Sequence, residues 1–327
     1  MEIIEKEIII IGAGPAGLVC ALEAAKQKLD YLILEKGLLA NSIYNFPTNM
    51  TFFSTSELLE IGGVPFISHT EKPTRKEALE YYRRIASSHK LNIHYRQEVK
   101  AIRKKLFKYE IKTQDKTYMC EYLILATGFY DTPKLLNCPG EELAKVKHYY
   151  DDAHPYIGQD VVVIGAANSA CDVALETWQK GAKVTMVIKG DSIYEKVKYW
   201  IKPNIENRIR EGSIKAYFQS EVKEIKPDEV LITTPDGDIS IPNDYVLAMT
   251  GYRPDSSFLE NVGIDLSIED KEPIINKETL ETNMSRIYVA GVIVAGNNTS
   301  KLFIENTRHH GKKIIADIMQ KRAASYA

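Results

Sequence analysis

Short apolar runs alternate with amphipathic segments almost throughout this chain of 327 residues. The apolar runs are rich in β-branched residues, and several of them end at a glycine. Continuous apolarity, in place of strict alternation, predicts strands that are covered on both faces. The runs that predict strands are residues 7–12, 31–37, 122–128, 160–166, 182–190, 244–251 and 286–292.

Amphipathic helical segments lie between these predicted strands. Residues 15–28 and 169–181 each follow a strand and a turn of small residues. Strand–helix alternation favours parallel sheets joined by right-handed crossovers. Because the strand–turn–helix–strand unit occurs twice, the pattern predicts an α/β protein with two Rossmann-like dinucleotide-binding domains.

The first unit contains the spacing Gly12-x-Gly14-x-x-Gly17. In a dinucleotide-binding turn the first glycine permits the tight bend, the second lets the backbone approach a pyrophosphate, and the third lets helix and strand pack closely. Glu35 ends the next strand, 23 residues after Gly12, where a carboxylate would accept from a ribose 2′-hydroxyl. This context favours a ligand-binding turn over a glycine-rich turn without a ligand.

The second unit is a relaxed version, Gly165-x-Ala167-x-x-Ala170. The strand after its helix ends at Lys189, near the place that Glu35 takes in the first unit. A carboxylate there would repel a 2′-phosphate, whereas an ammonium group would attract it. The first unit therefore suits an unphosphorylated ribose, as in FAD, and the second suits NADPH better than NADH.

Lys196 and Lys198 lie close to Lys189 in the sequence and could also help to bind the phosphate. The alternative is that these lysines belong to a solvated surface. A bound flavin in one unit and a nicotinamide in the other would explain why the chain needs two turns, because such cofactors carry hydride transfer while the protein positions them.

Composition excludes several other classes of protein. The net charge of −2 gives no reason to expect nucleic acid or an anionic membrane as a partner. No apolar run is long enough to span a bilayer or to form a signal-peptide core, so we expect a cytoplasmic protein. The four cysteines, expected to be reduced thiols, form no CxxC pair and have no metal-ligand spacing, so we expect no metal site.

These features resemble flavoproteins with two dinucleotide-binding domains, in particular the thioredoxin-reductase-like branch. Residues 126–128 (ATG), 249–254 (MTGYRP) and the turn at Gly291 match markers of that family. The resemblance implies a nicotinamide domain inserted into a flavin domain. The expected boundaries are an FAD-binding domain of residues 1–130 and 252–327 and an NADPH-binding domain of residues 131–251.

Thioredoxin reductase itself is disfavoured, because residues 148–160, just before the second turn, contain no CxxC. The chain is more similar to the YpdA family of bacillithiol disulfide reductases, over its whole length. The segments that carry this resemblance are residues 41–66, 148–156, 165–170 and 290–297.

The two cofactor sites expected from the motifs and the resemblance are as follows. The FAD site comprises Gly12, Gly14, Ala16, Gly17, Glu35, Lys36, Thr127, Gly128 and Gly291, and the NADPH site comprises Gly165, Ala167, Asn168, Ser169, Ala170 and Lys189.

This sequence departs from the YpdA pattern at the position of the cysteine proposed as the family's reactive thiol, where it has Ala16. Cys20 lies one helical turn further along the same face and is a weak candidate to replace it. A cysteine in a packed helix is more often a small buried hydrophobic residue, and the same holds for Cys171. Cys138 is expected on an accessible loop. Val292 stands where many relatives have an aspartate for the flavin ribitol, which predicts reduced flavin affinity.

Several other side chains are candidates for the flavin environment. Four aromatic residues either line the isoalloxazine ring or belong to the core: Tyr44, Phe46, Phe52 and Phe53. The histidines at 148 and 154 are expected to be structural or exposed, and those at 309 and 310 to lie on a solvated helix face. That last helix is expected to begin near Thr299 and Ser300, with its positive dipole end by the flavin pyrimidine.

The sequence thus predicts an enzyme that passes hydride from NADPH to FAD and on to a low-molecular-weight disulfide, such as bacillithiol disulfide. Two alternatives stay open: a ferredoxin or flavodoxin–NADP reductase, and a flavin redox sensor without turnover. The expected partner is a small-molecule disulfide or a small redox protein, with no nucleic acid and no membrane, and we expect a homo-oligomer.

Overall fold

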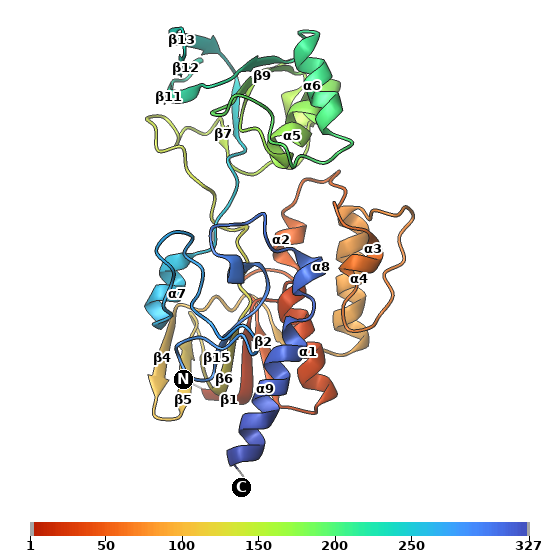
Figure 1. Ribbon diagram of the computed structural model, residues 1–327, viewed down its shortest axis with the longest axis vertical. Coiled ribbons are helices and arrows are strands. Elements are labelled where there is room, and N and C mark those ends of the chain that lie inside the picture. The colour runs from red at the N-terminus through yellow and green to blue at the C-terminus, as the bar shows by residue number, and fades with distance from the viewer. Residues whose placement is uncertain (1–2, 326–327) are drawn as a thin grey trace. The chain divides into compact units, whose positions relative to one another are not determined.

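A computed structural model describes residues 3–325 of the chain (Figure 1). The described residues divide into two compact units. Unit 1 comprises residues 3–45, 50–132 and 252–325, and unit 2 comprises residues 46–49 and 133–251. Each unit is built around its own mostly parallel sheet, so the predicted α/β class with two Rossmann-like units is confirmed.

The sheet of unit 1 has β1 (Ile3–Ile11) at its centre, between β2 (Tyr31–Leu34) and β6 (Thr117–Leu125). Both pairings are parallel, and β15 (Ile287–Val289) continues the parallel arrangement beside β6. The four isoleucines at the end of β1 are buried because both faces of the sheet are covered. The remaining strands of this sheet are β3 (Ile93–His94), β4 (Ala101–Lys105) and β5 (Lys108–Lys112), of which β4 and β5 are antiparallel.

Helices α1 (Pro15–Lys26) and α9 (His310–Ser325) pack side by side against this sheet (Figure 1). The packing is close, because a Cβ atom added to Gly311 would lie 2.9 Å from the Val19 backbone. The other helices of unit 1 are α2 (Asn41–Tyr44), α3 (Ser56–Leu59), α4 (Arg75–Ser88), α7 (Ser256–Val262), α8 (Ile304–Thr307) and the 3₁₀ turn η2 (Gly291–Ala295).

Unit 2 repeats the parallel plan with the strand order β10-β9-β8-β14-β7. A small antiparallel sheet, β11-β12-β13, accompanies it. The continuous-run pattern did not predict this sheet because its strands alternate between more and less exposed positions. The elements of unit 2 are β7 (Val146–Lys147), η1 (His154–Tyr156), β8 (Asp160–Ile164), α5 (Asn168–Gln179), β9 (Lys183–Val187), α6 (Lys202–Arg210), β10 (Lys215–Tyr217), β11 (Glu221–Ile225), β12 (Glu229–Thr234), β13 (Gly237–Pro242) and β14 (Tyr245–Ala248).

The start of the last helical segment was predicted wrongly. Residues 299–301 form a turn instead of a helix, because the Thr299 N–H bonds to the Asn297 carbonyl and the Lys301 N–H to the Asn298 carbonyl, in place of carbonyls four residues back. Helix begins only at Ile304, and it breaks before His310. The positive end of a helix dipole therefore does not lie at Thr299 and Ser300.

Residues 3–325 contain neither a membrane-spanning helix nor a cluster of metal ligands. Every helix in that range is too short or too polar to cross a membrane. The same range holds no group of three or more metal-ligating side chains positioned to bind an ion.

Candidate functional site

The first glycine turn joins β1 to α1 and is sterically restricted to glycine at two positions. Gly12 has φ +108°, and a Cβ atom on it would lie 2.4 Å from the Ala126 carbonyl oxygen. A Cβ atom on Gly17 would lie 1.9 Å from the Gly12 carbonyl oxygen. Both roles predicted from the spacing, the tight bend and the close packing of helix on strand, correspond to these contacts.

Space opens at the N-terminus of α1, in front of Gly14. A Cβ atom on this residue would meet no atom of the described chain within 4 Å, although Gly14 is the N-cap of the helix. The Leu18 N–H makes the first intrahelical bond, to the Gly14 carbonyl, so the amides of Ala16 and Gly17 precede the helical hydrogen-bond pattern. Open space facing helix N-terminal amides fits a pyrophosphate.

Glu35 lies beside this turn and is only 5% exposed. Its carboxylate accepts hydrogen bonds from the Ala13 N–H at 2.7 Å and the Gly37 N–H at 2.8 Å. Burial raises the pKa of Glu35, and the two amide hydrogen bonds oppose that increase. A carboxylate has about four acceptor positions, so the group keeps capacity to accept from ribose hydroxyls.

Two further turns reach the same region of unit 1. Gly128, after β6, has φ +72° and lies near the Ser42 hydroxyl of α2. Gly291, after β15, has φ +83°, and a Cβ atom on it would lie 2.7 Å from Ala16 Cβ. Lys36 forms an ion pair of 2.9 Å with Asp131. The first glycine turn and the Gly291 turn are therefore in direct contact at the start of α1.

His310 takes part in this arrangement, which the sequence did not reveal. The Gly291 N–H donates to His310 Nδ1 at 3.1 Å. The interpretation of His309 and His310 as one solvated helix face is wrong for His310, because burial lowers its pKa to about 4 and its ring bonds to the turn. No sequence pattern predicts this hydrogen bond, because it depends on how α9 packs on α1.

The second turn, in unit 2, has the same construction with a looser closure. Gly165 has φ +127°, and a Cβ atom on it would lie 2.6 Å from the Met249 carbonyl oxygen and 3.2 Å from Ala170 Cβ. Ala167 is the extended N-cap of α5. Ala170, at the third position, is tolerated because its methyl group faces Gly165, which has no side chain.

A loop of residues 190–201 is tied to this second turn. The Tyr194 N–H donates to the Ala166 carbonyl at 3.1 Å, and the Lys198 N–H donates to Asn168 Oδ1 at 2.8 Å. Lys198 Nζ donates to Asp172 Oδ2 at 2.7 Å. The hypothesis that Lys198 reaches a coenzyme phosphate is not supported, because its side chain is only 10% exposed and its charge is paired with Asp172.

Lys189 lies in a different environment from Lys198. Its side chain is 82% exposed, and its ammonium group lies 3.0 Å from Glu221 Oε1. An exposed pair of this kind is weak and exchanges readily with solvent. Lys189 is thus accessible to a phosphate but has a carboxylate beside it.

The cysteines are separate from one another, and none of the four is in a disulfide. Cys20 is fully buried in α1, and burial raises its pKa to about 12. Burial also raises the pKa of Cys171, to about 12, and that of Cys120. Cys138 is partly exposed, and partial burial together with Glu141 raises its pKa. These thiols lack the lowered pKa that marks reactive cysteines.

The other aromatic and histidine candidates do not form one cluster. Phe52 is buried in the core, whereas Tyr44 and Phe53 are about half exposed and Phe46 belongs to unit 2. His154 is exposed. These positions leave Tyr44 and Phe53 as the candidates of unit 1 that a ligand could contact.

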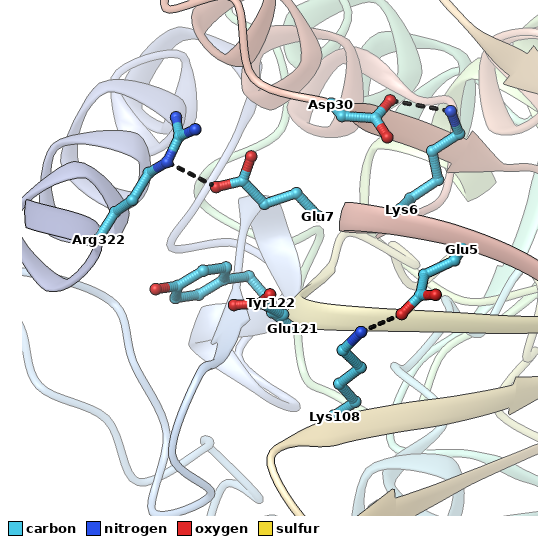
Figure 2. A pocket seen from close by; sticks show the side chains of 8 residues that line it. All are labelled: Glu5, Lys6, Glu7, Asp30, Lys108, Glu121, Tyr122 and Arg322. Carbon is cyan, nitrogen blue, oxygen red and sulfur yellow. Dashed lines mark hydrogen bonds and ion pairs between the residues drawn. The ribbon is translucent and has the colours of Figure 1, made fainter. Parts of the chain in front are cut away.

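A separate polar pocket lies near the first half of β1, away from the glycine turn at its end (Figure 2). Three of its four carboxylates pair with its three cations: Lys6 with Asp30, Lys108 with Glu5, and Arg322 with Glu7. The fourth, Glu121, lies 3.6 Å from Arg286, outside the lining. Such internal pairing leaves little net charge for a ligand.

The chain is similar to known proteins over most of its length. Residues 9–291 match the model of the pyridine nucleotide-disulphide oxidoreductase family. Bacilliredoxin reductase Bdr of Bacillus subtilis (strain 168) is 44% identical over 320 residues, which cover 97% of this chain and 99% of that protein.

Solved structures agree with the sequence relatives. Bacillithiol disulfide reductase Bdr (YpdA) from Staphylococcus aureus is 43% identical with a TM-score of 0.94, covering 97% of this chain and 99% of that one. The Bacillus cereus protein of the same name is 42% identical with a TM-score of 0.95, at the same coverage. A thioredoxin reductase from T. acidophilum, 21% identical with a TM-score of 0.77, shares the fold.

Proposed function

Because this chain belongs to the pyridine nucleotide-disulphide oxidoreductase family, we propose that it is an NADPH-dependent flavoprotein that reduces a disulfide of the bacillithiol type. The resemblance to the YpdA family is confirmed by relatives that match nearly the whole chain. FAD is proposed for unit 1 and NADPH for unit 2.

The observation that carries the proposal is the construction of the first turn. Gly12 and Gly17 close the turn so tightly that a methyl group at either position would collide with backbone, while the space before Gly14 stays open. Glu35 is buried at the adjoining strand end with its carboxylate fixed by two amides. This combination of open helix N-terminus and buried acidic acceptor suits a dinucleotide with an unphosphorylated ribose.

A bound flavin would supply two-electron transfer between a reduced nicotinamide and a disulfide, so that NADPH, one proton and RSSR would give NADP⁺ and two thiols. The residues of unit 1 would hold this cofactor. The amides at the start of α1 would face the pyrophosphate, Glu35 the ribose, and the Gly128 and Gly291 turns would bring backbone close to the rest of the molecule. Lys36 is held by Asp131 at the rim of the same region.

The second turn supports a nicotinamide coenzyme in unit 2. Gly165 and Ala170 keep α5 close to β8, and Asn168 is held by the Lys198 amide. Lys189 is exposed beyond β9, where a 2′-phosphate would be bound in this type of turn. Preference for NADPH over NADH rests on this lysine.

The proposed acceptor follows from the relatives and from the thiols. One relative is named a bacilliredoxin reductase and the solved structures are named bacillithiol disulfide reductases, so both names place a bacillithiol-related disulfide at the end of the reaction. The chain's own cysteines are separate and three of them are buried. Electrons would therefore reach the acceptor without a protein dithiol. The expected homo-oligomer and cytoplasmic location stay predictions.

The test is a steady-state assay of NADPH oxidation by FAD-loaded protein with a panel of acceptors. The panel contains bacillithiol disulfide, oxidised bacilliredoxin, ferredoxin and flavodoxin. Oxidation of NADPH with either of the first two and not with the others supports the proposal. Turnover confined to ferredoxin or flavodoxin would assign the chain to that class of reductase instead, and no turnover with any acceptor would favour a redox sensor.

A further inference from the structure

His310 begins α9 and contacts the backbone of a turn that is distant in the sequence. The N–H of Gly291, two residues after the end of β15, donates to its Nδ1 atom at 3.1 Å. A histidine nitrogen accepts a hydrogen bond only when it is unprotonated, so the ring is neutral with its proton on Nε2. The Gly291 N–H is therefore already hydrogen-bonded to a side chain of the protein.

The turn that receives this bond has little freedom. Gly291 has φ +83°, and its Cα lies so close to Ala16 that an added Cβ atom would be 2.7 Å from the alanine methyl. Ala16 belongs to the first turn of α1, whose amides face the open space before Gly14. A small shift of the Gly291 turn would change the wall of that space.

His310 is itself fixed by the packing of its helix. The next residue, Gly311, contacts the Val19 backbone so closely that a Cβ atom there would lie 2.9 Å away. The packing of α1 against α9 thus fixes the position of His310 relative to the first glycine turn. Because Gly291 is hydrogen-bonded to His310, its position is fixed as well.

We infer that His310 is a positioning residue, which holds the Gly291 turn against Ala16 and thereby sets the shape of the flavin site. The inference rests on the proposed function, because it assumes that unit 1 binds FAD. It assigns no contact between the histidine and the flavin. His309, its neighbour, is exposed and has no such role.

The test compares two variants that differ by one methylene. In His310→Asn the side-chain oxygen can take the place of Nδ1 and accept from Gly291, whereas in His310→Gln the oxygen lies one bond further from the backbone. The measurement is the dissociation constant of FAD, from quenching of flavin fluorescence on apoprotein. His309→Gln is the matched control, and thermal unfolding without FAD reports on the fold.

We expect His310→Asn and His309→Gln to bind FAD within about twofold of wild type, and His310→Gln to bind about tenfold more weakly, because a lost backbone hydrogen bond has roughly that effect. Equal affinity of the Asn and Gln variants would overturn the inference, whether both match wild type or both are weakened. Failure of the wild-type protein itself to bind FAD would refute the proposed function instead, so the two failures are distinguishable.

Discussion

Lys198 and Asp172 form a charge-assisted hydrogen bond of 2.7 Å that fastens the loop of residues 190–201 to helix α5. The lysine side chain is only 10% exposed, and the aspartate side chain is 28% exposed. The Lys198 amide also holds Asn168, the first residue of the helix. One residue therefore fixes the second glycine turn through both its backbone and its side chain.

Replacing Lys198 with methionine should weaken binding of NADPH and NADH equally. The variant roughly keeps the volume of the side chain but leaves the Asp172 carboxylate without its cation. Loss of such a partner lowers the stability of the local structure by about 1–3 kcal/mol when the remaining group is partly buried. The measurement is the dissociation constant of each coenzyme on the FAD-loaded protein. Lys196→Met, at an exposed neighbour, is the control. A loss confined to NADPH would mean that Lys198 contacts the phosphate after all.

Replacing Lys189, unlike Lys198, should affect one coenzyme and not the other. Lys189→Gln removes an exposed cation, so NADPH binding should fall roughly fivefold while NADH binding stays the same, since an exposed charge pair contributes about 1 kcal/mol or less. Glu221→Gln removes the carboxylate that lies 3.0 Å from this lysine and should tighten NADPH binding modestly. If Lys189→Gln affects both coenzymes equally, Lys189 does not determine the preference for NADPH.

The glycine turns were predictable from sequence because their chemistry is local. Gly12, Gly17 and Glu35 belong to one strand–turn–helix–strand unit, whose geometry fixes the spacing of its residues. The parallel strands were predictable for a similar reason, since burial on both faces demands continuous apolar runs.

What the sequence did not reveal depends on contacts between distant segments. His310 lies 19 residues from Gly291, and their hydrogen bond exists only because α9 packs on α1. The sequence also offered no means to distinguish Lys198 from Lys189. Only the fold shows that the Lys198 side chain is largely buried in its pair with Asp172, whereas that of Lys189 is exposed. Helix α8 begins at Ile304, later than expected, because the N–H groups of Thr299 and Lys301 are hydrogen-bonded within turns.

Gly17→Ala and Gly14→Ala should separate stability from cofactor binding. The methyl group of the first variant would lie 1.9 Å from the Gly12 carbonyl oxygen, so backbone must move and the free energy of unfolding should fall by roughly 1–3 kcal/mol or more. Gly14 has an ordinary φ of −76°, and its methyl group would enter open space.

We therefore expect Gly14→Ala to keep the stability of the apoprotein and to lose FAD affinity, because its methyl group occupies the space proposed for the pyrophosphate. Urea unfolding of apoprotein and FAD titration measure the two effects. Unchanged FAD affinity in Gly14→Ala would contradict the assignment of that space.

Stability should fall as the pH is lowered through the range in which His310 titrates. Burial, with smaller effects of Lys313 and His309, lowers the pKa of His310 to about 4 from an ordinary value of 6.5. Between these two values the unfolded chain binds a proton that the folded protein excludes, so acidification favours unfolding there; above them, the group is neutral in both states.

His310→Asn removes this contribution, so its stability should depend less on pH than that of wild type. The measurement is the free energy of unfolding in urea at pH 7 and pH 5 for both proteins. Other titrating groups contribute alike to each and cancel in the comparison. An identical decrease in the two proteins would show that His310 does not titrate as its burial implies.

In the proposed reaction, this chain reduces a bacillithiol-type disulfide without a thiol of its own. The most direct measurement counts NADPH consumed and thiols released from bacillithiol disulfide, supplied free or through oxidised bacilliredoxin, by wild type and by Cys20→Ala. We expect one NADPH for every two thiols, at equal rates for both proteins, because Cys20 is fully buried with a pKa raised to about 12. Loss of thiol release in Cys20→Ala that still binds FAD and oxidises NADPH with an artificial acceptor would contradict this expectation.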